Sequence, residues 1–255
     1  MARKPRDAVF TTALWDGNSK IADFEKHLER LAKHAEILRI TLPENLDQLI
    51  AQAIIDMDER YNYNRLLNIT FDCVDEAFRT KSRDLPKLRN CNLDSMTIPM
   101  KKWLGQVTGT KHGDWQFYLG AKDIAEQNGV DIALLIDEFC IIDGDRAAIV
   151  VIDEDGVAYF SENKQSVQGI TLEVLTSGFA EMGIPLSKAK LNERLVARST
   201  EVLAIGTGIG CCKILTIDGE EVGQDNSTIS SMLQAYLAQH YSNTDNWTDL
   251  CEYSR

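Results

Sequence analysis

A loop lysine is the first residue of this sequence whose type suits covalent chemistry. Lys111 lies in GTKHGDWQFYLGAKD (109–123), just before an aromatic-rich segment that the pattern predicts to be helical. A lysine amine condenses with an aldehyde, and once released it can carry a proton. Most lysines, however, are solvated surface residues. The chemistry of Lys111 therefore depends on the residues that accompany it along the chain.

The segment QGITLEV (168–174) is a candidate site for an anion such as phosphate. Gly169 frees the backbone, and Ile170 and Thr171 open a predicted helix. The first N–H groups of a helix have no partner inside the helix, so with the Thr171 hydroxyl they would point at an anion placed there. An ordinary helix cap is the more common use of such a segment.

A glycine-rich turn in LAIGTGIG (203–210) is a second candidate for phosphate. Its glycines are spaced one residue short of a dinucleotide-binding fingerprint, and a strand-like segment follows in place of a helix, which argues against a Rossmann fold. What remains is a turn with exposed N–H groups and the hydroxyl of Thr207, which can hold a phosphate. A plain structural turn is the alternative.

Two charged residues are candidates that have ordinary explanations when taken singly. Arg30, in HLERL, lies between Leu28 and Leu31, so it flanks the predicted apolar stripe of a helix without being part of it. Most arginines in such positions are solvated or extend along the surface. Asp143, in IIDGDR, occupies a turn between predicted strands, where Asp-Gly is common turn chemistry.

The elements that must position these residues are a mixture of helices and strands. An amphipathic helix is predicted over DFEKHLERLAKHAEILRI, with Asp23 as its N-cap. After Lys111 another helix runs to Asn128-Gly129, followed by short strands joined by the turns DGDR and DEDG. Because the strands do not alternate regularly with helices, we predict an α+β fold of two domains, residues 1–104 and 105–255, with Lys111 in the second.

The composition argues against several classes of function. A net charge of −12 disfavours nucleic acid or an anionic membrane as a general partner. No apolar run approaches the roughly 20 residues that span a bilayer, and the N-terminus lacks the apolar core of a secretory signal. The 6 cysteines are scattered, apart from Cys211-Cys212, which are interpreted as strand residues facing opposite sides. No metal site is predicted, and reduced thiols favour a cytoplasmic location.

Taken in order, these segments resemble the fold-type IV pyridoxal-phosphate enzymes, which include branched-chain and D-amino-acid aminotransferases and aminodeoxychorismate lyases. FTTALWDGNSKIADFEKHLERLAKHAEILRI resembles the family's N-terminal strand, turn and helix, and TKHGDWQFYLGAKDIAEQNGVDIALLID resembles its lysine segment. IIDGDRAAIVVIDEDGVAYF, VQGIT and AIGTGIG with IDGEEVG resemble the segments that follow. The resemblance covers about residues 8–225.

The resemblance implies a role for each candidate residue. Lys111 would form the Schiff base with pyridoxal 5'-phosphate, and Asp143 would face the pyridine nitrogen, where the family has glutamate. The phosphate would be held by Arg30, Ile170, Thr171 and Thr207. The implied architecture is a small α/β sandwich domain with a larger, β-rich pseudo-barrel domain.

This sequence departs from the family pattern at several positions. Gln116 stands where the family has a tyrosine that binds the cofactor's phenolic oxygen, and Tyr118 lies two residues further on. Ala147-Ala148 replaces a common Ser-Asn pair. The chain also begins abruptly, without the strand and loop that normally precede FTTA.

The function that the resemblance implies is transamination between an amino acid and a 2-oxo acid by a cytoplasmic homodimer. An aminodeoxychorismate lyase is an alternative, since FTTA is a common spelling in that branch. A degenerate homologue that binds the cofactor or a protein without catalysis is another, motivated by the changes at Gln116 and Asp143. The expected partners are small molecules, with no nucleic acid and no membrane.

Overall fold

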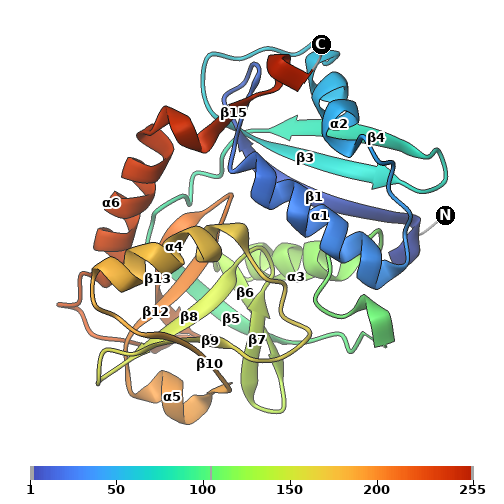
Figure 1. The fold of residues 1–255 in the computed structure, drawn as a ribbon. Coiled ribbons are helices and arrows are strands. Elements are labelled where there is room, and N and C mark those ends of the chain that lie inside the picture. Colours follow the sequence, from blue (N-terminus) through green and yellow to red (C-terminus); the bar gives the residue numbers. More distant parts are fainter. Residues whose placement is uncertain (1–2, 104, 254–255) are drawn as a thin grey trace. The chain divides into compact units, whose positions relative to one another are not determined.

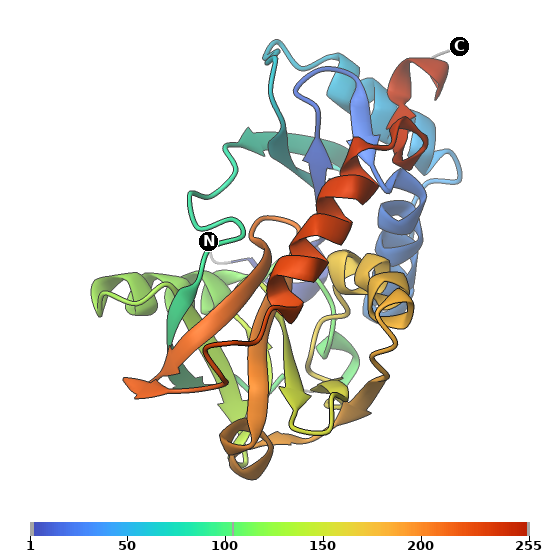
Figure 2. The same ribbon diagram turned by 90° about the vertical axis from the view of Figure 1, so that its left-hand side faces the viewer.

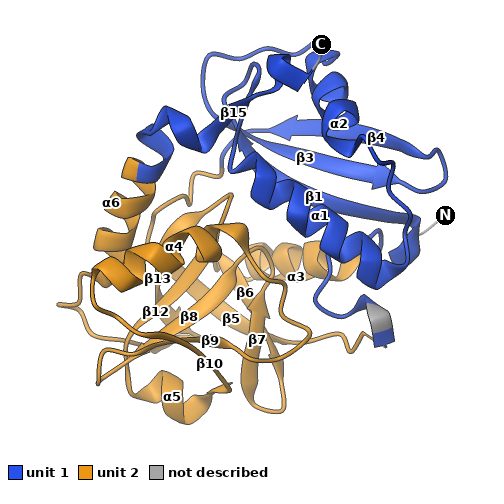
Figure 3. Ribbon diagram, viewed as in Figure 1, with its two compact units in different colours: residues 1–85, 104–115, 240–255 blue, residues 86–103, 116–239 orange. Residues whose placement is uncertain are grey.

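The computed structural model describes residues 3–103 and 105–253, which form two compact units (Figure 3). Unit 1 comprises residues 1–85, 104–115 and 240–255, and unit 2 comprises residues 86–103 and 116–239. The sequence-based division is a single cut after residue 104, whereas these units are discontinuous. Lys111 falls in unit 1 because its segment returns to the first strand, where Val9 and His112 form an antiparallel bridge.

Unit 1 is built on a five-stranded antiparallel sheet within the described residues, in the order β15-β2-β1-β3-β4. Its strands are β1 (Ala8–Trp15), β2 (Lys20–Ala22), β3 (Arg65–Asp72), β4 (Ala77–Arg83) and β15 (Trp247–Asp249). The edge strand β4, AFRTKSR, carries charged side chains at alternate positions, which discourages pairing with another chain.

Two helices, α1 (Phe24–Leu38) and α2 (Leu46–Ile55), cover one face of this sheet (Figure 1). The predicted apolar stripe of α1 is buried against β1, β3 and α2 in one core that includes Phe24, Leu31 and Leu38. Four short 3-10 helices complete the described part of unit 1: η1 (Pro5–Asp7), η2 (Gly105–Val107), η3 (Thr244–Asn246) and η4 (Leu250–Tyr253).

The N-cap of α1 differs from the expectation in its chemistry. Asp23 does precede the helix, but its backbone is left-handed (φ 52) and its side chain makes no capping hydrogen bond. Its carboxylate instead pairs with His240 Nε2 at 2.9 Å. A contact with a residue more than two hundred positions away therefore replaces the local one.

Unit 2 contains a ten-stranded mixed sheet in its described residues, with the path β10-β9-β8-β12-β13-β5-β6-β7-β11 and β14 paired to β13. The strands are β5 (Leu93–Pro99), β6 (Ile132–Asp137), β7 (Cys140–Gly144), β8 (Ala148–Asp153), β9 (Ala158–Ser161), β10 (Leu186–Ala189), β11 (Leu191–Asn192), β12 (Ser199–Gly206), β13 (Gly210–Ile217) and β14 (Glu220–Glu221). Both β7 and β11 also approach β9, so the sheet curls back on itself as the pseudo-barrel expectation requires.

The central strands β8 and β12 of unit 2 are buried at almost every position, which is typical of strands whose sheet is covered on both faces. The long β12–β13 hairpin, orange in Figure 2, carries the predicted glycine-rich turn, and Gly206 pairs with Gly210 across it. The helices are α3 (Gln116–Gln127), α4 (Ile170–Glu181), α5 (Glu193–Ala197) and α6 (Ile229–Ser242), whose last residues are counted with unit 1. None of the described helices is long and apolar enough to cross a membrane.

Candidate functional site

Lys111 is held through both of its backbone polar groups. Its N–H donates to His34 Nδ1 at 3.1 Å, and its carbonyl accepts a hydrogen bond from the Phe10 N–H at 3.2 Å. The neighbouring bridge between Val9 and His112 extends this pairing along β1. The backbone of Lys111 is therefore held from two sides, by α1 and by β1.

The amine of Lys111 lies over two aromatic rings. Its Nζ is 4.7 Å from the centroid of the Trp115 ring and 5.2 Å from that of Phe10. The two rings meet edge to face at 5.0 Å, so they form one aromatic support. An ammonium group is attracted to such ring faces, and this attraction helps to orient the side chain.

Arg30 is buried, which corrects the expectation that it only flanks the core stripe. Its side chain donates a hydrogen bond to Thr11 Oγ1, and the same hydroxyl hydrogen-bonds to His27 Nδ1 at 2.7 Å. His27, Arg30 and His34 follow one another at helical spacing on the face of α1 that meets β1. A polar row at this spacing is the sequence signal that could have identified the arginine as part of an interior site.

The two histidines of α1 indicate that this part of unit 1 is electropositive. Burial, followed by the charges of Arg30 and Lys111, lowers the pKa of His27 well below its usual value. The same causes, with smaller contributions from Lys33 and His112, lower the pKa of His34 to about 3. Both rings are therefore neutral near pH 7, and a bound anion would relieve the repulsion between the remaining positive charges.

These pKa shifts predict that acid destabilises the protein before its carboxylates titrate. The unfolded chain takes up a proton at each histidine near pH 6.5, whereas the folded chain does so only at much lower pH. Stability present above pH 6.5 should therefore be lost as pH falls, and His34 alone should account for about 2 kcal/mol of this loss between pH 7 and pH 5. Urea titrations of the cofactor-free protein measure this change. His34→Asn should remove the His34 contribution, and a free energy of unfolding that is flat across this window would contradict the prediction.

Unit 2 brings together two of the predicted phosphate residues. Thr171 Oγ1 and Thr207 Oγ1 are 3.3 Å apart, although they are 36 positions apart in sequence. Thr171 follows Ile170 in the first turn of α4, and Gly169 is the N-cap. Thr207 lies in the turn between β12 and β13. A hydroxyl pair beside the first N–H groups of a twelve-residue helix is a suitable arrangement for an anion.

Asp143 is buried near the end of β7 and not in an exposed turn. Its carboxylate accepts hydrogen bonds from the N–H groups of Val167, at 2.9 Å, and Gly144, at 3.0 Å. The Val167 contact ties β7 to the loop that leads into α4. Burial, followed by the charge of Asp143, raises the pKa of Tyr118 well above its usual range, against a smaller opposing effect of Trp103. Asp143 and Tyr118 therefore interact, while Gln116 is exposed.

The site residues predicted from sequence thus fall into two groups, each described within its own unit. Lys111 and Arg30 belong to unit 1, and the others, Asp143, Ile170, Thr171 and Thr207, belong to unit 2. Sequence reasoning missed the side chains that support the first group, which are Phe10, Thr11, His27, His34 and Trp115.

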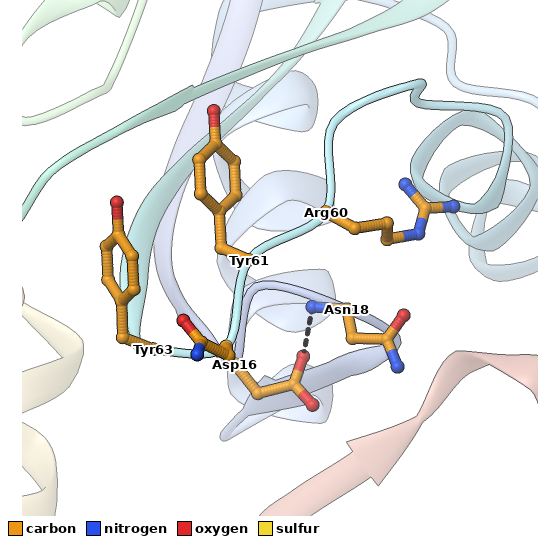
Figure 4. Close-up of a pocket in the computed structure, with 6 residues that line it drawn as sticks. Asp16, Asn18, Arg60, Tyr61 and Tyr63 are labelled. Atoms are coloured by element: carbon orange, nitrogen blue, oxygen red, sulfur yellow. Dashed lines mark hydrogen bonds between the residues drawn. The ribbon is translucent and has the colours of Figure 1, made fainter.

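A surface pocket elsewhere in unit 1 is a weaker candidate for a functional site than the residues around Lys111 (Figure 4). It has a volume of about 720 Å³ and is lined by Asp16, Asn18, Arg60, Tyr61, Asn62 and Tyr63. Its charged groups hold the surrounding loops: Asp16 accepts from the N–H of Asn18 at 2.8 Å, and Arg60 donates to three backbone carbonyls. Among the described residues there is also no cluster of His, Cys, Asp or Glu that could hold a metal ion.

The family model described as "Amino-transferase class IV" matches residues 8–217 of this chain. Among curated proteins, the probable branched-chain-amino-acid aminotransferase of Rickettsia felis is 21% identical over 226 residues, which are 83% of this chain and 77% of that protein. The protein with the same description from Rickettsia bellii is 20% identical over 216 residues, which are 79% of this chain and 75% of that protein.

Solved structures with the same fold are also similar over most of their length. The branched-chain aminotransferase of the thermophilic archaeon Thermoproteus uzoniensis, solved with norvaline, gives a TM-score of 0.77 at 17% identity, covering 96% of this chain and 90% of that one. A hypothetical aminotransferase from Mycobacterium tuberculosis, in its PLP-bound form, gives a TM-score of 0.77 at 15% identity. The match covers 92% of this chain and 90% of that one. The expected fold is therefore confirmed.

Proposed function

This chain belongs to the amino-transferase class IV family, and we propose that it moves an amino group between an amino acid and a 2-oxo acid with pyridoxal 5'-phosphate as cofactor. The observation that carries the proposal is Lys111. It lies within the matched residues, and its backbone is fixed by His34 and Phe10 while its amine lies over two aromatic rings. A surface lysine with no function has no need of this support.

The residues present suit this cofactor. An aldehyde needs an amine, a phosphate needs cationic and N–H donors, and a pyridinium nitrogen needs a carboxylate. Lys111 supplies the first. Arg30, Ile170, Thr171 and Thr207 supply the second, and the buried Asp143 supplies the third. When bound, pyridoxal 5'-phosphate provides the aldehyde for covalent attachment and a ring that withdraws electrons from the substrate α-carbon.

Each side chain then has one task. Arg30, oriented by its hydrogen bond to Thr11, neutralises phosphate charge. Thr171 and Thr207, whose hydroxyls lie side by side, would donate hydrogen bonds to a phosphate. Asp143 would supply the carboxylate that keeps the ring nitrogen protonated. With the cofactor bound, Lys111 would supply the amine for its attachment, and its Nζ would be the group that carries a proton from the substrate α-carbon.

Assembly and location are part of the same proposal. A homodimer is proposed from the family resemblance, and size-exclusion chromatography with light scattering measures it. A cytoplasmic location is supported by the cysteines: all six, including the buried pair Cys211 and Cys212, are free thiols. Burial raises the pKa of both buried thiols, which keeps them protonated and unreactive.

An amino-acid panel with a spectral readout tests the activity. The protein loaded with pyridoxal 5'-phosphate should be yellow, and a true amino donor such as alanine, glutamate or leucine should bleach the colour and release its 2-oxo acid. Consumption of aminodeoxychorismate with no response to amino acids would identify the lyase instead. A yellow protein that responds to neither would be the non-catalytic homologue.

Arg30→Ala should weaken pyridoxal-phosphate binding about 10- to 150-fold, because a charge-assisted contact of roughly 1.5–3 kcal/mol is lost. Thr171→Ala and Thr207→Ala should each cost less, about 0.5–1.5 kcal/mol, since the other donors remain. Cofactor titration followed by absorbance measures all three affinities. Lys33→Ala is the control, because it removes an exposed positive charge from the same helix. Equal affinities for Arg30→Ala and Lys33→Ala would show that Arg30 serves only the fold.

A further inference from the structure

We propose that His34 is a positioning residue for Lys111: its unprotonated Nδ1 holds the backbone N–H of Lys111 and so fixes the point from which the lysine side chain reaches its cofactor. The proposal rests on the proposed function in one respect, namely that Lys111 is the attachment residue. The geometry itself does not depend on that assignment.

The contact joins two segments that are far apart in sequence. His34 lies in the third turn of α1 and is 3% exposed, and its Nδ1 is 3.1 Å from the backbone nitrogen of Lys111, 77 positions later. The carbonyl of Lys111 is held at the same time by Phe10. With both backbone groups engaged, the lysine Cα has little freedom. The side chain then needs to order only its own rotamers to place Nζ over Trp115 and Phe10.

The contact requires a particular state of the imidazole. Nδ1 can accept a hydrogen bond only when the ring is neutral and its proton is on Nε2. The groups that face His34 favour this state from both segments: Arg30 and Lys33 on α1, and Lys111 and His112 on the lysine segment. Burial and these charges lower the pKa of His34 to about 3. The acceptor is therefore available throughout the range from pH 5 to pH 8.

Two variants separate the acceptor from the bulk of the side chain. His34→Asn places an amide oxygen where Nδ1 stands, whereas His34→Leu has similar bulk and no acceptor. Hydrogen exchange of the Lys111 amide in the cofactor-free protein is the readout. Exchange should be at least about 10-fold faster in His34→Leu than in the parent, and His34→Asn should resemble the parent.

The control is His240→Leu, which removes another histidine of unit 1, the one paired with Asp23, and should leave the Lys111 amide unchanged. Equal protection in His34→Leu and the parent would overturn the proposal, as would equally rapid exchange in His34→Leu and His34→Asn. A purely structural role would accelerate exchange across α1 and not selectively at Lys111.

A second measurement needs no variant that must fold. The chain has 4 histidines, so their ring nitrogens can be resolved by ¹⁵N NMR. His34 should show a neutral ring protonated on Nε2 and no titration between pH 5 and pH 8. A proton on Nδ1, or a charged ring at pH 6, would overturn the proposal.

The outcome is distinguishable from failure of the proposed function. If the amide and ring measurements succeed but the protein does not bind pyridoxal 5'-phosphate, His34 positions Lys111 and the cofactor assignment is wrong. If the cofactor binds to Lys111 and His34→Leu does not change amide exchange, the proposed function is supported and the proposed role of His34 is wrong.

Discussion

Replacing Lys111 with alanine should reduce amino-group transfer by about 10²–10⁴-fold or more, because the same amine serves as attachment point and proton carrier. The fold should survive, since the contacts of this half-buried loop side chain with two rings are worth no more than about 1 kcal/mol each. Reduction of the loaded parent protein with borohydride should fix the cofactor to Lys111, and peptide mass mapping locates the label.

The neighbouring lysines provide the contrast for this experiment. Lys101 stacks on Trp103, Lys102 pairs with Asp137 at 3.1 Å, and Lys122 pairs with Glu126 at 2.7 Å. Lys122→Ala is therefore the matched control, and it should retain activity. A reduced label on any of these three lysines would show that Lys111 is not the attachment residue.

The features that follow from local patterns were predictable from sequence. The apolar stripe of α1, the glycine before α4 and the hairpin around the GTGIG turn each depend on spacing within a few residues, and the structure has all three. The order of such segments carried the family resemblance. The family match confirms the predicted family and its aminotransferase class, and the structural neighbours confirm the fold class.

The features that depend on distant contacts were not predictable. The local pattern alone placed Arg30 beside the apolar stripe, because its neighbours in sequence do not reveal Thr11, which lies on another element. The contact of His34 with Lys111 could not be predicted, since it is made to a backbone N–H, which any residue at that position except proline would supply. Asp23 was expected to cap its helix, but His240 at the far end of the chain binds its carboxylate.

Two departures from the family pattern, at Gln116 and Asp143, can be examined in the structure of unit 2. Gln116 is exposed at the start of α3, whereas Tyr118 is buried, and its burial and the charge of Asp143 raise its pKa. The shorter carboxylate of Asp143 is also tied to the N–H groups of Gly144 and Val167. Asp143 therefore has a structural contact with the loop before α4 in addition to the role proposed for it, and an experiment must separate the two.

Asp143→Asn should slow transfer by about 10²–10⁴-fold while the yellow, cofactor-bound protein still forms. The change removes the charge that keeps the ring nitrogen protonated, but covalent attachment to Lys111 does not need that charge. The amide also turns an N–H donor toward one of the two backbone N–H groups, so stability should fall by about 1–3 kcal/mol. Stopped-flow absorbance of a single turnover with an amino donor measures the rate, and urea titration measures the stability.

Asp145→Asn is the matched control for Asp143→Asn, because Asp145 is another buried carboxylate of the same segment with backbone and ionic partners. It accepts from the N–H of Ala133 at 3.0 Å and pairs with Arg146 at 2.6 Å, so its loss should lower stability without the same loss of rate. Asp143→Glu, which restores the family residue, should keep the charge and much of the rate. If Asp143→Asn turns over as fast as the parent while Asp145→Asn does not, the ring nitrogen is served by Asp145, and Asp143 only anchors the loop before α4.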